Sequence, residues 1–286
     1  MKSFKEKFGE IVFLISAIMS ILLIILITFF IFRSGIDFVN KYGLIKFITG
    51  NKWAPTAKPA FFGIGPMIIG SIIVTLLSAI IAIPFGLAVS IFMAYYSKKY
   101  YNFLNGLINL MAAIPSIIYG FFAMMVLVPF VSKTFKTGGM NMLTASILLA
   151  IMILPTMVNI SKNSLEQVPE VFYTGSLALG ATKEETIRKV MVPYAKSGIY
   201  SSIILAIGRS IGETMAVYLV IGNQPRMPGG LLDGVRTLTT NIVLEMGYAS
   251  GLHRESLIAT GMVLFVFILL INIVFNFIRN KDQARM

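Results

Sequence analysis

The sequence predicts an all-α membrane protein with six transmembrane helices. Of its 286 residues, 57% are hydrophobic and only 13% are charged, whereas soluble domains carry about 45–50% apolar and about 25% charged residues. A transmembrane helix needs about 20 predominantly apolar residues, and the chain contains six runs of that kind. They cover residues 11–32, 67–94, 104–131, 142–160, 198–222 and 256–278.

The first run follows several lysines, which is also a feature of secretory signals. The apolar stretch of a signal is only about 7–15 residues long and ends in a small-residue cleavage site. Residues 11–32 are longer and lack such a site. We therefore expect a retained first helix, with a signal peptide as the alternative.

Loop charges indicate the orientation of the chain in the membrane. An even number of spans puts both termini on one side, and Lys and Arg are denser in the segments that share a side with the termini. Because cytoplasmic loops carry an excess of Lys and Arg, we expect a multi-pass cell-membrane protein with both termini in the cytoplasm.

The net charge of +12 has an ordinary explanation in such a protein. Cationic loops meet anionic lipid head groups, and no Lys- and Arg-dense stripe suggests nucleic acid as a partner. The chain has no cysteine and one histidine, His253. Disulfides, thiolate metal sites and imidazole clusters are therefore not expected.

Three of the predicted spans contain proline, including Pro84, Pro115 and Pro155. Neighbouring helices can satisfy the backbone groups that a proline frees within a membrane. Kinked helices around a cavity would show this pattern, and so would a packing compromise without functional meaning.

The polar stretch 161–197 between the fourth and fifth spans predicts two short helices. Pro169 suits a first helical position and Gly180 the residue just past a helix end. Thr182 and Glu185 predict a capping box for a second helix, which Pro193 should limit. Such an element could insert into a groove on another protein, or it could lie along the membrane as an amphipathic loop.

The fifth run is exceptional because it contains two charged residues, Arg209 and Glu213. An arginine at the bilayer centre costs roughly 2.5–3.5 kcal/mol, so such residues are functional candidates. Their spacing of four predicts a shared helical face, and Gly208 and Gly212 have the spacing that admits another helix closely. The pair is either a structural ion pair or an anion site in which the guanidinium meets an oxyanion.

Residues 174–193 resemble the EAA loop of ABC importer permeases. That pattern reads Glu-Ala-Ala, three residues, Gly, nine residues, then Ile-x-Leu-Pro; this chain keeps the glycine and the final proline and departs at Thr174-Gly-Ser176. The resemblance implies a coupling helix that sits in a cleft of an ATPase subunit. The residues that it assigns to coupling are Gly180, Ala181, Thr182, Glu185 and Pro193.

Residues 208–217, Gly-Arg-Ser-Ile-Gly-Glu-Thr-Met-Ala-Val, resemble the PstC-type phosphate permeases of ABC transporters. Further matching segments are residues 53–55, 62–66, 113–120 and 236–240. The resemblance implies the type I importer permease fold, with an N-terminal helix and external loop over 1–66 and a permease core over 67–286 that includes the coupling loop. It places Arg209 and Glu213 on the substrate path. Ser116 is a further candidate for the path, with packing as the competing explanation.

The resemblance also implies an assembly. Its members would be a PstA-like permease, two copies of a PstB-like ATPase, a PstS-like external phosphate-binding protein and a phosphate-sensing regulator. The chain has no Gly-x-x-x-x-Gly-Lys-Ser/Thr loop, so we expect it to hold no cofactor and no catalytic residue, with ATP and Mg on the ATPase. The alternatives are a permease for sulfate or molybdate, or an ion-coupled secondary transporter or channel, which usually shows internal repeats.

Overall fold

The computed structural model describes residues 4–97 and 99–283, which are helical except for one two-stranded sheet and the connecting loops. Five helices are long and apolar enough to cross a membrane, and a sixth crossing results if one bent pair forms a single span. The five are Phe8–Tyr42, Gly65–Tyr95, Ser116–Phe135, Met142–Glu166 and Gly251–Val274. The predicted all-α membrane class is confirmed.

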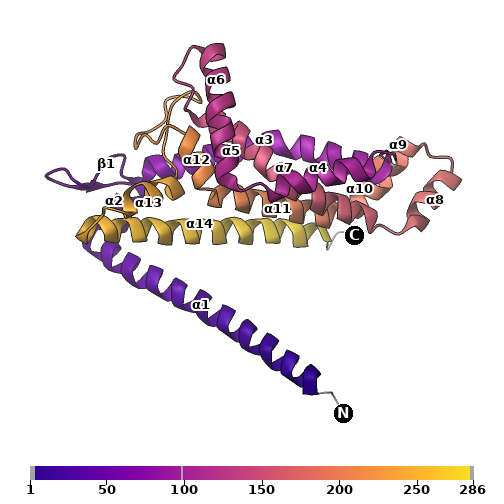
Figure 1. The fold of residues 1–286 in the computed structure, drawn as a ribbon, viewed down its shortest axis with the longest axis horizontal. Coiled ribbons are helices and arrows are strands. Elements are labelled where there is room, and N and C mark those ends of the chain that lie inside the picture. Colours follow the sequence, from indigo (N-terminus) through magenta and orange to yellow (C-terminus); the bar gives the residue numbers. More distant parts are fainter. Residues whose placement is uncertain (1–3, 98, 284–286) are drawn as a thin grey trace.

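Three helices form the centre of the molecule. They are α3 (Gly65–Tyr95), α7 (Met142–Glu166) and α11 (Lys196–Gly212), which lie along the long axis in Figure 1. α3 and α7 approach closely because Gly86 has no side chain: a Cβ there would lie 2.8 Å from the sulfur of Met157. The two helices therefore form a tightly packed base for α11.

The third apolar run is not one helix, contrary to the prediction. It divides into α4 (Tyr101–Ala113), α5 (Ser116–Phe122), the π-helical η1 (Ala123–Leu127) and α6 (Val128–Phe135). The break falls at Ile114 and Pro115, which are both extended, because a residue before proline is disfavoured in the helical region. Beyond the break, α5 and α6 turn across the long axis (Figure 1).

The fifth run is also interrupted. α11 ends at Gly212, Glu213 is extended with ψ of 131°, and the short α12 (Met215–Val220) follows. The run is therefore a single helix only up to Gly212. A bend of 68° separates α11 from the helical stretch Lys183–Tyr194 before it.

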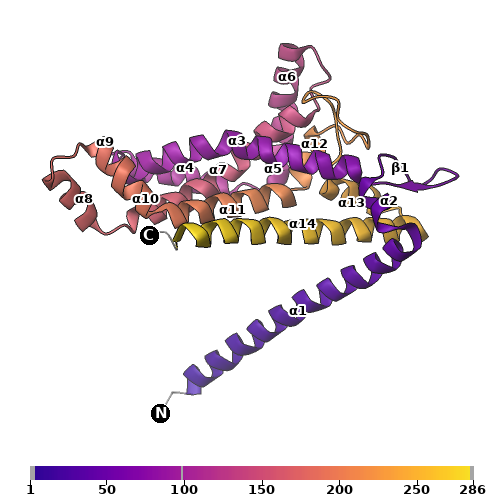
Figure 2. The ribbon, with the colours of Figure 1, turned by 180° about the vertical axis from the view of Figure 1, so that it is seen from behind.

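The two terminal helices, α1 (Phe4–Tyr42) and α14 (Gly251–Gln283), meet at one end of the molecule and diverge from there (Figures 1 and 2). Where they meet, Phe38 is fully buried with Phe47 of α2 (Leu44–Thr49). Toward the N-terminus the apolar side chains of α1 are exposed. α1 therefore presents most of its length to lipid or to another subunit.

This meeting point, here called the sheet end, is closed by buried polar contacts. β1 (Trp53–Ala54) pairs antiparallel with β2 (Phe61–Phe62), and the indole N–H of Trp53 donates to Glu245 of α13 (Leu238–Met246) over 2.9 Å. Glu245 also pairs with Arg236 and with His253. One carboxylate thus holds three segments together.

The opposite end, here called the coupling end, carries α8 (Glu170–Ala178), α9 (Lys183–Thr186), η2 (Ile187–Met191) and α10 (Val192–Tyr194). The first and last described turns of the chain lie toward this same end (Figures 1 and 2). The extreme residues, 1–3 and 284–286, are outside the described part. The arrangement agrees with an even number of crossings.

Candidate functional site

Arg209 lies in the last turn of α11, and its side chain is exposed. Its Nη1 donates a hydrogen bond to Thr156 Oγ1 of α7 over 3.1 Å. Thr156 follows Pro155 directly, near the middle of α7. The guanidinium therefore stands beside the middle of α7, with a neutral hydroxyl as its partner.

Glu213 is turned away from the helical face that its spacing predicts. Because the chain leaves the helix at Glu213, its carboxylate accepts from the backbone N–H of Ala216 over 3.2 Å and so caps α12. None of the ion pairs among the described residues joins it to Arg209. The predicted shared face is wrong, and Arg209 remains without a carboxylate partner in the described part of the chain.

Hydroxyl groups surround the position of Glu213. Thr239 Oγ1 donates to the Glu213 carbonyl over 3.1 Å, and Ser210 shares a hydrogen bond of 2.9 Å with Ser78. A small cavity at this position has a lining rich in side-chain hydroxyls, contributed by Ser71, Thr75, Ser210, Thr237 and Thr239. Sequence reasoning missed this cluster because its members come from three separate segments, namely α3, α11 and the start of α13.

Ser116 is the first residue of α5 and is half-buried. Two residues on the same helix fix its position: the Tyr119 hydroxyl donates to the Met111 carbonyl over 2.8 Å across the Pro115 break, and Gly120 packs against Ala216 of α12. None of the hydrogen bonds among the described side chains joins Ser116 to Arg209. Its place on the substrate path stays a prediction.

The glycines beside Arg209 face open space. A Cβ on Gly208 or Gly212 would meet nothing within 4 Å in the described part of the chain. The close helix approach predicted from their spacing is therefore not made within this chain. The surface formed by Gly208, Arg209 and Gly212 is left uncovered.

The coupling end has the predicted helix, glycine, helix form. α8 ends before Gly180, whose φ of +86° lies in the left-handed region that glycine tolerates. Thr182 and Glu185 form both hydrogen bonds of a capping box at the start of α9. The half-buried Ala181 connects the two features.

Both prolines of this region differ from their predicted roles. Pro169 is the N-cap of α8 rather than its first helical residue. Pro193 does not stop the second helix, which passes through η2 and ends at Tyr194. A π-helical turn shifts hydrogen bonding to i→i+5, and this accommodates the missing N–H of proline.

α8 has no buried residue, although it carries large apolar side chains. Val171 is 68% exposed and Leu179, just past the helix, is 92% exposed. An apolar surface on a projecting helix is suited to contact with another protein.

The coupling segment is attached to the end of α3. Lys183 Nζ donates to the Tyr95 carbonyl over 2.8 Å and lies 4.1 Å from the ring centroid of Tyr96. The Ser176 and Thr186 hydroxyls, 2.9 Å apart, join α8 to α9. A displacement of the coupling segment would therefore be transmitted directly to a central helix.

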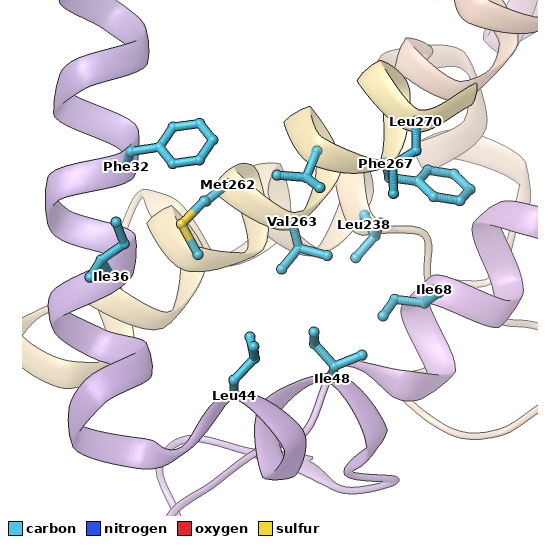
Figure 3. Close-up of a pocket in the computed structure, with 11 residues that line it drawn as sticks. Phe32, Ile36, Leu44, Ile48, Ile68, Leu238, Met262, Val263, Phe267 and Leu270 are labelled. Atoms are coloured by element: carbon cyan, nitrogen blue, oxygen red, sulfur yellow. The ribbon is translucent and has the colours of Figure 1, made fainter. Parts of the chain in front are cut away.

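An apolar pocket lies elsewhere, between α1, α2, α3, α13 and α14 (Figure 3). Its lining is almost wholly hydrophobic and includes Phe32, Leu44, Met262 and Phe267. A pocket of this composition offers an anion no hydrogen-bond donors. It therefore does not compete with Arg209 as an oxyanion site.

Comparison with protein families places residues 82–281 in one family model, described as "Binding-protein-dependent transport system inner membrane component". The chain is 38% identical to the probable ABC transporter permease protein YqgH of Bacillus subtilis, covering 92% of this chain and 88% of that protein. It is 34% identical to the probable phosphate transport system permease protein PstC of Methanocaldococcus jannaschii, covering 88% and 87%. The PstC protein of Mesorhizobium japonicum is 32% identical, covering 89% and 84%.

Solved structures show the same fold. A bacterial alginate ABC transporter has a chain that superposes with a TM-score of 0.67 at 13% identity, covering 98% of both chains. The MetNI methionine ABC transporter gives a TM-score of 0.63 at 19% identity, covering 77% of this chain and 95% of the other. At these identities the likeness concerns the fold alone.

Proposed function

The chain belongs to the family of binding-protein-dependent transport system inner membrane components, and from this premise we propose that it is a permease subunit of an ATP-driven phosphate importer. As a permease it is not itself an enzyme. The substrate proposal is supported by relatives at 32–34% identity that are named phosphate transport permeases. It is supported equally by the chemistry of the site.

Arg209 carries the proposal. A guanidinium has five N–H donors and no acceptor, in a planar fork that can bind two oxygens at once. Here one donor is used on Thr156, and no carboxylate of the described residues pairs with it. Because an arginine facing lipid is costly, we infer that its exposed side faces the translocation path, where a tetrahedral oxyanion replaces the missing counter-charge.

The proposed assembly explains the uncovered surfaces. A PstA-like permease covers the face of Gly208, Arg209 and Gly212, so that the path runs between two subunits. Two PstB-like ATPases, which hold ATP and Mg, receive the exposed α8, and a PstS-like protein delivers phosphate at the sheet end. The coupling end and both termini are then cytoplasmic, and a phosphate-sensing regulator could bind there.

Transport follows from the attachment of the coupling segment to α3. ATP binding closes the ATPase dimer and moves α8, and the contact of Lys183 with Tyr95 passes that movement to the central helices. The site at Arg209 thus opens alternately toward the sheet end and toward the coupling end. Glu213, beside the hydroxyl-lined cavity, is the substrate-path residue on the sheet-end side of Arg209.

The test is uptake of radiolabelled phosphate into proteoliposomes that contain the reconstituted complex, with and without this subunit. The proposal predicts uptake that requires both ATP and the subunit, and that excess sulfate or molybdate does not suppress. Suppression by those ions would indicate another oxyanion permease. Uptake that persists without any ATPase would indicate an ion-coupled transporter.

A further inference from the structure

A second cation, Lys162, is buried in the coupling-end half of α7. Only 5% of the residue is exposed. Its Nζ donates to Asn105 Oδ1 of α4 over 2.8 Å and lies 5.1 Å from the ring centroid of Tyr101. Glu166 is four residues further along the same helix, yet none of the ion pairs among the described residues includes Lys162.

This arrangement is unusual because buried lysines are normally paired with an opposite charge. Taking an ammonium out of water without a counter-ion has a large free-energy cost. An amide oxygen and an aromatic ring offset part of that cost but leave the full positive charge. The site therefore retains a positive potential that an anion could satisfy.

A polar row connects Lys162 to Arg209. Arg209 contacts Thr156, Asn159 Nδ2 donates to Asn109 Oδ1 over 3.3 Å, and Lys162 contacts Asn105. Thr156, Asn159 and Lys162 are three residues apart on α7, which is a rise of roughly 4.5 Å for each step. We call these residues the polar row: Thr156, Asn159, Lys162, Asn105, Asn109 and Arg209.

The row has a direction. α7 runs from the sheet end toward the coupling end (Figure 1). Lys162 therefore lies nearer than Arg209 to the coupling end, which is proposed above to be cytoplasmic. α4 contains no Asp or Glu, and Glu166 is the one acidic residue in α7. An anion that leaves Arg209 in this direction would therefore meet amide donors and then the ammonium of Lys162, with no carboxylate of α4 or α7 before it.

We propose that Lys162 forms a second phosphate site, on which the ion rests between leaving Arg209 and entering the cytoplasm. In this site the phosphate oxygen takes the place of Asn105 Oδ1 as the partner of the ammonium, and the Asn159 and Asn109 amides supply donors on the way. The inference rests on the proposed function, because it assumes that phosphate passes Arg209. The competing explanation is a purely structural role, in which the hydrogen bond of Lys162 stabilises the packing of α4 on α7.

Cysteine protection in the assembled transporter tests the site directly. The chain has no cysteine, so Asn109→Cys introduces a single thiol into its polar row. We expect phosphate on the coupling side to slow the modification of that thiol by an anionic methanethiosulfonate. Because Lys162→Gln removes one charge-assisted hydrogen bond, the phosphate concentration that gives half-protection should rise about tenfold in that variant. Leu107→Cys, on another face of α4, is the control whose modification rate phosphate should not change.

Two further variants distinguish a phosphate site from a structural role of Lys162. Glutamine keeps a donor for Asn105 but loses the charge, whereas Lys162→Arg keeps the charge and should restore protection. Asn105→Ala removes the competing acceptor, so protection should occur at equal or lower phosphate concentration. A structural role predicts the reverse: Lys162→Gln would leave the protection at position 109 unchanged, and Asn105→Ala would destabilise the complex.

The outcomes also distinguish this site from the proposed function. Uptake that depends on Arg209, with no phosphate protection at position 109 and no effect of Lys162→Gln, would overturn the second site and leave the proposed function standing. Failure of the complete complex to import phosphate would overturn both.

Discussion

Arg209 and Thr156 join α11 to α7 through one hydrogen bond of 3.1 Å from a guanidinium to a neutral hydroxyl. The bond orients the guanidinium without neutralising it. It also places the charge beside the middle of α7, one of the three central helices. Both properties are what a transient site for an oxyanion requires, since binding must be specific and release must remain possible.

Thr156→Val should weaken phosphate transport without abolishing it. Valine has nearly the same shape but cannot accept the hydrogen bond, so the guanidinium loses its orientation. Because a hydrogen bond to a charged group contributes roughly 1.5–3 kcal/mol, we expect KM for uptake to rise about tenfold or more. Thr156→Ser, which keeps the hydroxyl, is the control and should stay close to the unaltered protein; equal KM values for all three proteins would contradict a positioning role.

Gly180→Ala should uncouple ATP hydrolysis from transport. A side chain at φ of +86° costs roughly 1–2 kcal/mol, although a Cβ would meet nothing within 4 Å. The strain therefore acts on the backbone turn between α8 and α9. Parallel measurements of ATPase rate and phosphate uptake should show less phosphate moved for each ATP hydrolysed.

Gly175→Ala is the matched control for that experiment. Gly175 lies inside α8 and also has free space around it, but its backbone does not have a positive φ. Alanine should be tolerated there and should favour the helix slightly. Equal uncoupling by both variants would show that the added methyl group, and not the positive-φ turn at Gly180, causes the loss of coupling.

The start of α9 should weaken at low pH. The hydrogen bond with Lys189 and those with Thr182 hold the pKa of Glu185 below its usual 4.5. Glu185 belongs to the coupling segment, before the 68° bend that separates this segment from α11. Its contribution to stability is present above the unfolded pKa and is lost as the pH falls through the lowered value. Amide hydrogen exchange in α9, corrected for the intrinsic pH effect, should therefore speed up below about pH 4.5.

Glu185→Gln is the control for the pH experiment. It removes the titrating carboxylate while keeping a side chain that can reach the Thr182 N–H, so exchange in α9 should become independent of pH in that range. If exchange in α9 of this variant kept its full pH dependence, a titrating group other than Glu185 would be responsible.

Glu245→Gln should destabilise the sheet end strongly. The carboxylate pairs with the buried Arg236 and with His253, and it accepts from Trp53. Removing one partner of a buried ion pair leaves an uncompensated charge and typically costs 3–5 kcal/mol. Thermal unfolding in detergent should show a clearly lowered Tm for this variant.

Glu255→Gln provides the comparison at the surface. It breaks the Lys41–Glu255 pair, in which both side chains are substantially exposed, and such pairs contribute about 0–1 kcal/mol. Its Tm should stay near that of the unaltered protein. Equal Tm shifts for Glu245→Gln and Glu255→Gln would contradict the role given to the buried cluster.

The spans were predictable because lipid selects long apolar runs, a signal that needs no tertiary information. The Pro115 break had a visible cause in the sequence, whereas the break at Glu213 did not. There the extended backbone is stabilised by groups distant in sequence, since the Thr239 hydroxyl donates to the Glu213 carbonyl. The shared face of Arg209 and Glu213 was therefore predicted wrongly.

The polar row was only half visible in the sequence. Thr156, Asn159 and Lys162 recur every three residues in and just beyond an apolar run, which could have marked a polar helical face. The partners of Asn159 and Lys162 on α4 are 50 and 57 residues away in sequence. Only the packing of α4 on α7 shows that these two sets of residues meet.

The central claim is that the exposed guanidinium of Arg209 binds the transported phosphate. The most direct measurement is the initial rate of ATP-driven phosphate uptake by complexes with Arg209→Gln and Arg209→Lys, purified to equal subunit composition. We predict that the glutamine variant assembles but imports no phosphate, and that the lysine variant, which keeps the charge but lacks the fork, retains a small part of the rate. Full uptake by the glutamine variant would contradict the claim, and so would a failure confined to assembly.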